Sequence, residues 1–332
     1  MNKLTIALIF LALSLDAKMI SRTQVVMSTF ITITADQKDK KFIEDGFKII
    51  KDAENSLSSY NPKTPIYLLN KNRYAKLDKY AYEALSLSKK YYEKTDGYFD
   101  ITIGSITKDL YGFGEKNRLP SSKELSDAKV CFNNIRFNEN EAFLKKEMKV
   151  DLGGMGKGFS IDKVRRYFIK NGVKEGVISA SGDIRCLSTC KINIQNPFIE
   201  DASLASFETA KEDLGITTSG NYNRYVLSTQ NNHLINPKSK KPQTDFISVT
   251  LIGELSNSDL DAYATAISVM PLKEAYKFLQ KIKVGYIILQ SDKELVISKN
   301  ISKYADNLLV DYTIKKKPKY IEYKSQKSKK RK

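Results

Sequence analysis

The sequence predicts an α+β fold, from the order of its elements and from two missing motifs. Segments with strand-like alternation and segments with helical spacing mix along the chain without a regular βαβ order. Neither GxGxxG nor GxxxxGK[ST], the phosphate-binding signatures of doubly wound folds, occurs in the sequence. The chain of 332 residues shows no internal repeat and no Pro/Gly/Ser-rich linker. This length allows one large domain or two smaller ones.

The first half of the chain begins with a predicted strand over residues 24–36, where apolar and polar residues alternate. A helix is predicted for about 40–57, where apolar residues recur at helical spacing. Two prolines and an asparagine predict a loop over 58–70. A second helix is predicted over 78–94. Only short strands and a Pro-Ser turn are expected between 108 and 149.

The second half of the chain is predicted to alternate between strands and helices in the same way. A helix over 163–171 is expected to end at Gly172, which suits the residue that follows a helix. The remaining strands are expected at 176–184, 191–197, 216–226, 246–253, 285–290 and 294–298, and the remaining helices at 260–270 and 273–282.

Residues 1–17 are predicted to be a secretory signal peptide. Lys3 precedes an apolar run over 4–13 and a small-residue exit at 14–17. The run is about half the 20 residues that a membrane span needs. We therefore expect an exported protein that is soluble after signal cleavage, in a bacterial periplasm or envelope.

The positive charge is concentrated at the C-terminus. The formal net charge is +17, and residues 315–332 carry nine Lys and one Arg against Glu322 alone. Such a block is typical of a disordered, solvated extension, so the folded domain is predicted to span 18–314. An exported protein whose tail has few aromatic residues is not expected to bind nucleic acid. Weak contact with an anionic membrane surface, or with an acidic partner, fits the tail better.

Three cysteines occur in the sequence. Cys186 and Cys190 are close enough to form a small disulfide in an oxidising compartment, with Cys131 left over. The short spacing and the lack of an accompanying histidine do not favour a zinc site. We interpret the cysteines as structural or incidental.

The segment VDLGGMGKGFSID, at 150–162, joins a strand to a helix through a glycine-rich turn. Such a turn exposes backbone N–H groups and lets a ligand approach the main chain. Asp151 contributes a carboxylate at the strand end, and Lys157 contributes a positive charge. A glycine-rich turn with a surface lysine is an equally good interpretation of this segment alone.

The segment SDLDAYATAI places Asp261 and Thr265 four residues apart at the start of a helix. This spacing puts a carboxylate and a hydroxyl on one face, one turn apart. Two oxygen ligands suit Mg²⁺ better than zinc. Taken alone, however, an acidic helix start with a threonine inside the helix is the commoner explanation.

His233 is the only histidine in the chain. It precedes an Asn-Pro turn in HLINP and follows Arg224 and a Ser-Gly turn in TTSGNYNRYV. These groups could meet a phosphate, although a lone histidine is more often a packing or surface residue.

Read in order, eight segments resemble the successive motifs of the FAD:protein FMN transferase family, also called ApbE. They span residues 27 to 267, which is most of the chain after the signal peptide. The eight segments are MSTF, SSYNPKTPIYLLN, TDGYFDITIGSI with LYGFG, VDLGGMGKGFSID, SGDI, TTSGNY, HLINP and DAYATAI.

The resemblance implies an enzyme that binds FAD in a central cleft surrounded by mixed sheets and helices. It would use Mg²⁺ to transfer the FMN half of FAD onto a Thr or Ser hydroxyl of an acceptor protein and release AMP. The family suggests an acceptor with an FMN-binding domain, such as an electron-transfer subunit. Two alternatives share this site: an Mg²⁺-dependent FAD pyrophosphatase, and a flavin-binding protein without catalysis.

The resemblance also implies roles for particular residues. His233 matches the family's candidate general base, and its pKa, if near the ordinary 6.5, suits proton acceptance at neutral pH. Asp261 is expected to act in catalysis as a metal ligand, together with Thr265 and the backbone oxygen of Gly154. The positions that match flavin contacts are Met27, Tyr60, Tyr98, Phe99, Asp100, Asp151, Lys157 and Ile235.

Three positions depart from the family's usual motifs. Ser28 replaces a glycine in MSTF, where backbone approaches ligand. Asn236 replaces an aspartate in HLINP, which puts a metal or acid role at this position in doubt. The turn that follows, KSKKP, lacks a glycine.

Overall fold

The structure is a computed structural model that describes residues 18–311 and 319–321. Helices and several sheets mix along the described chain, so the predicted α+β class is confirmed. The predicted signal peptide lies outside the described residues. So does the predicted basic tail, apart from 319–321. No helix in the described part is long and apolar enough to span a membrane.

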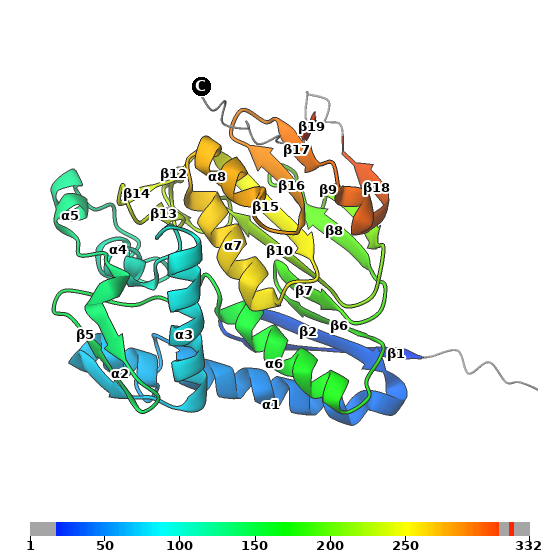
Figure 1. Ribbon diagram of the computed structural model, residues 1–332, viewed down its shortest axis with the longest axis horizontal. Helices are drawn as coiled ribbons and strands as arrows, with labels where there is room; N and C mark the ends of the chain where they lie inside the picture. Colours follow the sequence, from blue (N-terminus) through cyan, green and yellow to red (C-terminus); the bar gives the residue numbers. More distant parts are fainter. Residues whose placement is uncertain (1–17, 312–318, 322–332) are drawn as a thin grey trace, which may run out of the picture.

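A nine-stranded sheet forms the centre of the molecule (Figure 1). Its neighbouring strands pair antiparallel, except that β17 and β19 are parallel. In spatial order the strands are β1 (Met19–Val26), β2 (Thr29–Asp36), β6 (Gly176–Ala180), β7 (Asp183–Cys186), β10 (Leu214–Gly220), β15 (Phe246–Gly253), β16 (Gly285–Gln290), β17 (Leu295–Ser298) and β19 (Lys319–Ile321).

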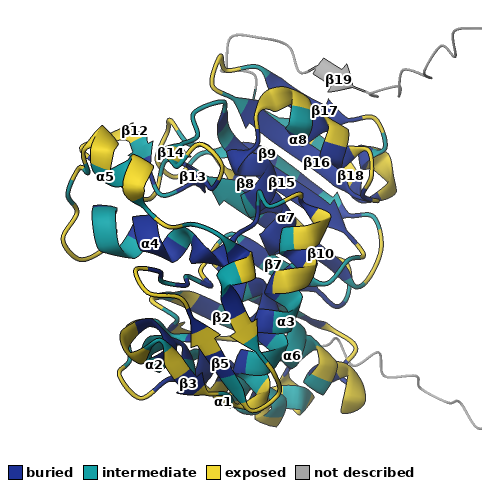
Figure 2. Ribbon diagram, turned by 60° about the vertical axis from the view of Figure 1, so that its left-hand side comes forward, coloured by how far each residue is buried: buried dark blue, intermediate teal, exposed yellow. Residues whose placement is uncertain are grey.

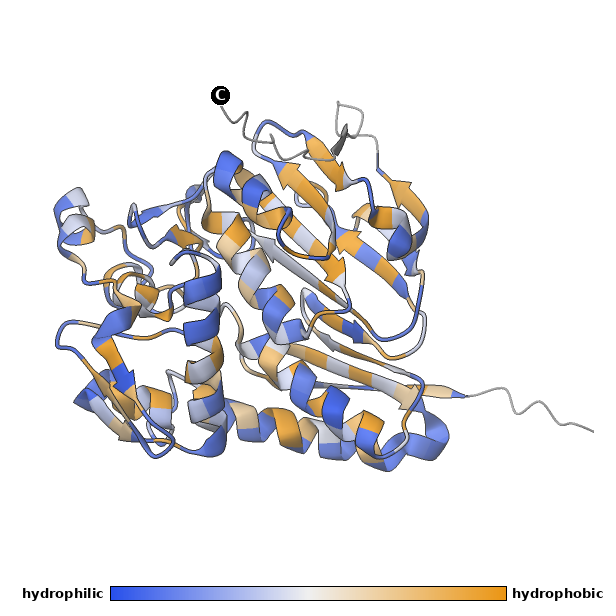
Figure 3. Cartoon of the chain, viewed as in Figure 1, coloured by the Kyte–Doolittle hydropathy of each residue, from blue (hydrophilic) through white to orange (hydrophobic). Residues whose placement is uncertain are grey.

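Strands β15, β16 and β17 of this sheet are buried on both faces. Successive strand residues point to opposite faces, and β16 follows this rule. Tyr286 and Ile288 pack into the core beneath the helices, whereas Ile287 and Leu289 pack into a second core. A three-stranded sheet covers that second core; its strands are β8 (Lys191–Gln195), β9 (Ser203–Thr209) and β18 (Ala305–Val310). Apolar residues on both faces explain the nearly continuous hydrophobic colouring of β15 to β17 in Figure 3.

Helices form the layer on the other face. The two that position the candidate site, α6 (Gly156–Lys170) and α7 (Asn257–Val269), lie side by side against the large sheet (Figure 1). The other helices of this layer are α1 (Lys40–Leu57), α3 (Lys79–Lys94) and α8 (Leu272–Leu279). Figure 2 shows that the sheet and the inner sides of these helices are buried.

A smaller region, at the left of Figure 1, consists of short elements. Its longest helix is α2 (Pro65–Asn72), which packs near a three-stranded sheet of β3 (Tyr74–Lys76), β5 (Glu141–Leu144) and β4 (Ile135–Phe137). Further short elements here are η2 (Ile101–Ile103), α4 (Gly104–Ile106), η3 (Thr107–Tyr111), α5 (Ser122–Asp127), η4 (Phe132–Asn134), β11 (Tyr225–Val226), β12 (Ser228–Asn232), β13 (Ile235–Asn236) and β14 (Lys241–Pro242). Elsewhere, η1 (Gln37–Asp39) precedes α1 and η5 (Ile301–Lys303) precedes β18.

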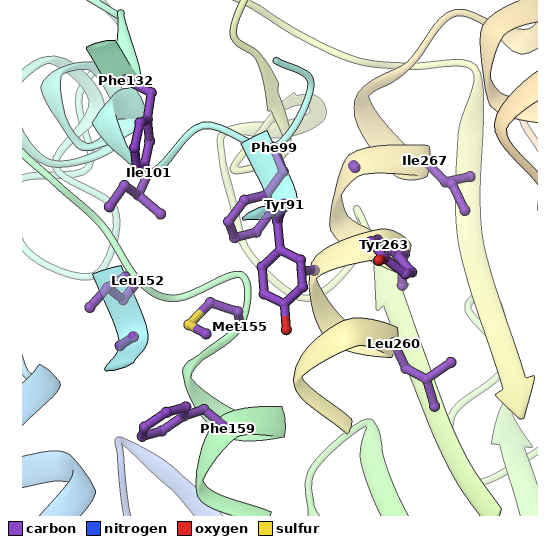
Figure 4. Close-up of a cluster of buried hydrophobic side chains, with 14 of the residues drawn as sticks. Tyr91, Phe99, Ile101, Phe132, Leu152, Met155, Phe159, Leu260, Tyr263 and Ile267 are labelled. Atoms are coloured by element: carbon purple, nitrogen blue, oxygen red, sulfur yellow. The ribbon is translucent and has the colours of Figure 1, made fainter. Parts of the chain in front are cut away.

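One cluster of aromatic side chains connects these parts. Tyr91 of α3 packs edge-to-face on Phe99 and on Tyr263 of α7, with ring centroids 5.6 and 5.8 Å apart. Met155 and Leu152, from the glycine-rich segment before α6, belong to the same buried cluster (Figure 4). The cluster therefore fixes three segments that carry predicted site residues.

Several predicted boundaries were wrong. Residues 58–70 are not a loop throughout, because Pro65 opens α2 and the Thr64 hydroxyl accepts the N–H of Tyr67 as a helix cap. The helix predicted at 163–171 begins seven residues earlier, at Gly156. The strand predicted at 176–184 is a hairpin of β6 and β7, and the strand predicted at 216–226 ends at Gly220.

Candidate active site

A cavity of about 770 Å³ lies between the large sheet and the smaller region. All twelve residues predicted from the sequence line it: Met27, Tyr60, Tyr98, Phe99, Asp100, Asp151, Gly154, Lys157, His233, Ile235, Asp261 and Thr265. They come from six separate segments of the chain, and the structure brings all twelve together at one cavity. Their individual roles stay predictions.

Close approach of α6 and α7 brings Lys157 next to Asp261. A Cβ atom at Gly158 would lie 2.2 Å from the backbone oxygen of Asn257, so only glycine allows this contact. The N–H of Gly158 donates to Asp261 Oδ2 at 3.2 Å. Asp162 fixes the start of α7 from the same helix, since its carboxylate accepts the backbone N–H groups of Asn257 and Ser258.

Lys157 lies between two buried carboxylates. Its Nζ is 3.0 Å from Asp183 Oδ2 and 3.6 Å from Asp261 Oδ2. Burial works against the ammonium charge, but the two carboxylates outweigh it and hold the pKa of Lys157 above its ordinary value. Burial, together with the negative charge of Asp183, raises the pKa of Asp261 to about 7.

The predicted metal ligands lie close together and have suitable chemistry. Thr265 Oγ1 is 3.3 Å from the carbonyl oxygen of Gly154, and Asp261 precedes Thr265 by one turn of α7. A Cβ at Gly154 would lie 2.9 Å from the Thr265 methyl group, so the glycine keeps this space open. A carboxylate, a hydroxyl and a carbonyl are the hard oxygen ligands that Mg²⁺ prefers. The donor set therefore fits Mg²⁺.

The described residues contain no group of three or more His, Cys, Asp or Glu side chains that would hold a metal by themselves. The predicted set has only one such side chain and depends on a hydroxyl and a main-chain oxygen. Magnesium binding stays a prediction.

Asp151 is held by neighbours from the smaller region. Its Oδ2 accepts from the Thr107 hydroxyl at 2.9 Å and lies 3.6 Å from Lys108 Nζ. Burial opposes the charge, but Lys108 and Arg224 outweigh it and hold the pKa of Asp151 below its ordinary value. Asp151 is therefore ionised and belongs to a positively charged wall of the cavity.

Both carboxylate oxygens of Asp100 accept hydrogen bonds from neighbouring protein groups. One of its carboxylate oxygens accepts the N–H and hydroxyl of Thr102, and the other accepts the N–H of Phe132. Burial raises the pKa of Asp100, while these hydrogen bonds lower it to a smaller extent. Its side chain thus shapes the segment that presents Tyr98 and Phe99 to the cavity.

His233 is half-buried beside Arg224. Its Nδ1 lies 3.1 Å from the Arg224 carbonyl oxygen, which accepts the Nδ1 proton and leaves Nε2 unprotonated in the neutral ring. Burial, with the nearby positive charge of Arg224, lowers the pKa of His233 to about 4. The ring is therefore neutral at pH 7, and the ordinary value used in the sequence-based expectation does not hold.

The unusual Asn236 has a structural explanation. Its Nδ2 donates to the carbonyl oxygen of Val269, the last residue of α7, at 2.8 Å, and its Oδ1 accepts the N–H groups of Lys238 and Ser239. An ionised aspartate cannot donate to Val269. Asn236 therefore closes the KSKKP turn and ties it to α7, and it does not line the cavity.

Ser28 lies in the tight turn between β1 and β2, whose ends pair at Val26 and Thr29. Both turn residues, Met27 and Ser28, have positive φ, 56° and 59°. This is the conformation in which a glycine is easily accommodated. The Met27 N–H donates to Glu54 Oε1 at 2.7 Å, which anchors the turn at the cavity.

Sequence reasoning missed several residues of this site. Asp183 is the first residue of β7 and lies in the SGDI motif, so a carboxylate within a motif of the family could have identified it as a site residue. Lys108, Thr107 and Glu54 carried no signal, because only the fold brings them to Asp151 and Met27. The sequence left open whether Cys186 and Cys190 are bonded; they form a disulfide, and Cys131 is free.

The fold and the cavity define an α+β protein with a charged, oxygen-lined site. A family model for the ApbE family matches residues 27–288, which is most of the chain. The chain belongs to the ApbE family, and the resemblance inferred from the motifs is confirmed.

Curated relatives carry the name FAD:protein FMN transferase. The protein of Buchnera aphidicola subsp. Baizongia pistaciae (strain Bp) is 28% identical over 265 residues, covering 74% of this chain and 77% of that protein. The protein of Escherichia coli (strain K12) is 26% identical over 207 residues, covering 57% and 58%.

Solved structures share the fold. The ApbE protein of Thermotoga maritima matches with a TM-score of 0.76 and 21% identity over 86% of this chain and 98% of that one. Flavin transferase ApbE from Vibrio cholerae matches with a TM-score of 0.74 and 20% identity over 88% and 98%.

Proposed function

We propose that this protein transfers the FMN half of FAD onto a Thr or Ser hydroxyl of an acceptor protein and releases AMP, with Mg²⁺ bound at the cavity. The observation that carries the proposal is the convergence of all twelve family-matched positions on one cavity in a member of the ApbE family. The names of the curated relatives agree with this activity.

The reaction needs charge neutralisation at a diphosphate more than covalent chemistry by the protein. Mg²⁺, when held by Asp261, Thr265 and the Gly154 carbonyl oxygen, would supply positive charge to the diphosphate. Lys157 supplies a fixed ammonium from the adjacent helix turn. The Lys157 ammonium stabilises the negative charge that accumulates on the departing AMP, and a bound Mg²⁺ would add to this stabilisation.

The acceptor hydroxyl oxygen forms a bond to the FMN phosphorus while the bond to the bridging oxygen of AMP breaks. The hydroxyl proton passes to a base. His233 suits this role because its Nδ1–H is held by the Arg224 carbonyl, so that Nε2 carries the free lone pair. With its pKa lowered to about 4, the ring is neutral throughout the physiological range, so Nε2 is unprotonated before the reaction, although it is a weaker base than that of an ordinary histidine.

One experiment separates this proposal from the two alternatives that share the site. Purified protein is incubated with FAD, Mg²⁺ and an FMN-binding acceptor domain that contains a threonine. Covalent flavin fluorescence on the acceptor, with AMP in equal amount, supports the transferase. FMN and AMP without labelled acceptor identify a pyrophosphatase, and FAD binding without either product identifies a carrier.

The cellular setting is part of the proposal. The apolar N-terminal segment suits export, and the Cys186–Cys190 disulfide suits an oxidising compartment such as the periplasm. An electron-transfer protein with an FMN-binding domain is the proposed acceptor, and the basic tail is proposed to make weak contact with a membrane surface. Export is tested by following the mature chain in periplasmic and cytoplasmic fractions; retention of an uncleaved chain in the cytoplasm contradicts it.

A further inference from the structure

Asp183 is a buried carboxylate with an incomplete set of partners. Its exposed fraction is 1%, and its Oδ2 lies 3.0 Å from Lys157 Nζ. Its Oδ1 is also buried and has no hydrogen-bond partner within the described part of the chain. Buried polar atoms are nearly always paired, so an unpaired carboxylate oxygen beside a ligand cavity calls for an explanation.

One ammonium serves two carboxylates here. Asp183 and Asp261, both buried, share that of Lys157. When both carboxylates are ionised, one of their two negative charges has no cation to balance it, which agrees with the raised pKa of Asp261. The predicted Mg²⁺ at Asp261 would supply that cation.

Lys157 and a metal ion compete for the same carboxylate. Lys157 Nζ is 3.6 Å from Asp261 Oδ2, the residue predicted to bind Mg²⁺. The shorter distance, 3.0 Å, is to Asp183. Asp183 thus offers Lys157 a second carboxylate that the predicted metal ligand set does not use.

We propose that Asp183 is a positioning residue that draws the Lys157 ammonium toward itself and so weakens the pairing of Lys157 with Asp261, which leaves the Asp261 carboxylate more available to the metal ion. With Asp183 present, Lys157 keeps its ion pair and its charge when the metal binds, and its ammonium stays at the wall of the cavity. Without Asp183, Lys157 pairs with Asp261 alone and opposes metal binding. This inference rests on the proposed function in one respect, namely that Asp261 binds a divalent cation.

The test measures affinity for Mn²⁺ alone, by the electron paramagnetic resonance signal of free Mn²⁺, with no FAD or acceptor present. The variants are Asp183→Asn, which keeps the side-chain shape, Lys157→Gln, which removes the competing charge, and the double variant. Glu254→Gln is the matched control, because it removes a carboxylate that is 65% exposed and pairs with Lys211 outside the cavity.

When Lys157 is present, Asp183→Asn is expected to weaken Mn²⁺ binding by roughly tenfold or more. In the Lys157→Gln background the loss of affinity is expected to be several-fold smaller, because the effects of substitutions at residues in contact are not additive. Glu254→Gln is expected to leave the affinity unchanged. Equal losses in both backgrounds would overturn the proposal, since Asp183 would then act as a direct ligand or as a simple charge. Unchanged Mn²⁺ affinity in Asp183→Asn would also overturn it.

Circular dichroism and thermal unfolding establish that each variant is folded. If Asp183→Asn does not fold, Asp183→Ser, which is smaller and also uncharged, completes the same cycle. The FMN transfer assay on the unmodified protein is read separately. If transfer fails but Asp183→Asn weakens Mn²⁺ binding more when Lys157 is present, only the proposed function is rejected. If transfer succeeds but Asp183→Asn weakens Mn²⁺ binding equally with and without Lys157, only the role of Asp183 is rejected.

Discussion

At the scale of single residues, the cavity is defined by charges that neighbouring residues hold in fixed states. Lys157 stays protonated because two carboxylates face it, and Asp151 stays ionised because Lys108 and Arg224 are near. His233 is kept neutral by burial and by Arg224. Lys157 and Asp151 thus keep the charges ordinary for their residue types in spite of burial, whereas the lowered pKa of His233 depends on its surroundings and could not be predicted from the motifs.

The pKa of His233 can be measured directly, because it is the only histidine in the chain. We expect its imidazole proton resonance in an untagged protein to titrate with a midpoint near pH 4. Between this value and the ordinary 6.5, the unfolded chain binds more protons than the folded one, so acidification through this window lowers stability through His233. A midpoint near 6.5 in the folded protein, equal to that in urea, would show that the site does not lower this pKa.

The role of Asn236 leads to a stability prediction. Asn236→Asp, which restores the family's usual residue, is expected to lower the free energy of unfolding by about 1–3 kcal/mol. An ionised carboxylate would face the Val269 carbonyl oxygen, at the negative end of the α7 dipole. Urea unfolding at pH 7 measures this loss. The loss should shrink near pH 4, where the introduced carboxyl is protonated and can donate; an equal loss at both values contradicts the explanation.

At the scale of elements, the site depends on how closely α6 approaches α7. Gly158→Ala is expected to destabilise the protein by about 1–3 kcal/mol or more, because its Cβ would overlap the backbone of Asn257. Gly156→Ala, at the first residue of α6, is the control, since its Cβ meets only the end of the Met27 side chain at 3.4 Å. Similar unfolding free energies for the two variants would contradict a tight helix contact.

The sequence predicted some elements well and others poorly, for physical reasons. The strand 246–253 and the strand 285–290 were placed correctly because both are long apolar runs. The start of α6 was missed because Gly156 and Gly158 are poor helix formers, and packing against α7 overrides that preference. Strands β9 and β18 carry a weaker pattern and were not predicted.

The location of the candidate site could be predicted from the sequence, although the roles of its residues stay predictions. The twelve positions that the ordered motifs identified all line the cavity, and each lies in a short segment with a distinctive sequence. The contacts of Lys108 and Asp183 in the site are seen only in the structure. Lys108 Nζ lies 3.6 Å from Asp151 Oδ2, and Asp183 Oδ2 lies 3.0 Å from Lys157 Nζ. No spacing along the chain encodes those distances.

At the scale of the whole molecule, the two layers and the smaller region together make one cavity that no single segment contains. Strand β10 of the large sheet supplies Thr218 and Ser219, and α7 supplies Asp261 and Thr265, while the smaller region supplies Thr107 and Lys108. Membership of the ApbE family agrees with this arrangement.

The most direct test of the proposed FMN transfer is mass spectrometry of a threonine-containing acceptor domain after incubation with FAD and Mg²⁺. We expect a mass gain of one FMN moiety on a hydroxyl residue, an equal amount of AMP, and a loss of at least about a hundredfold in rate for Asp261→Ala. An acceptor that stays unmodified while FAD is cleaved, or an Asp261→Ala variant as active as the original protein, would contradict it.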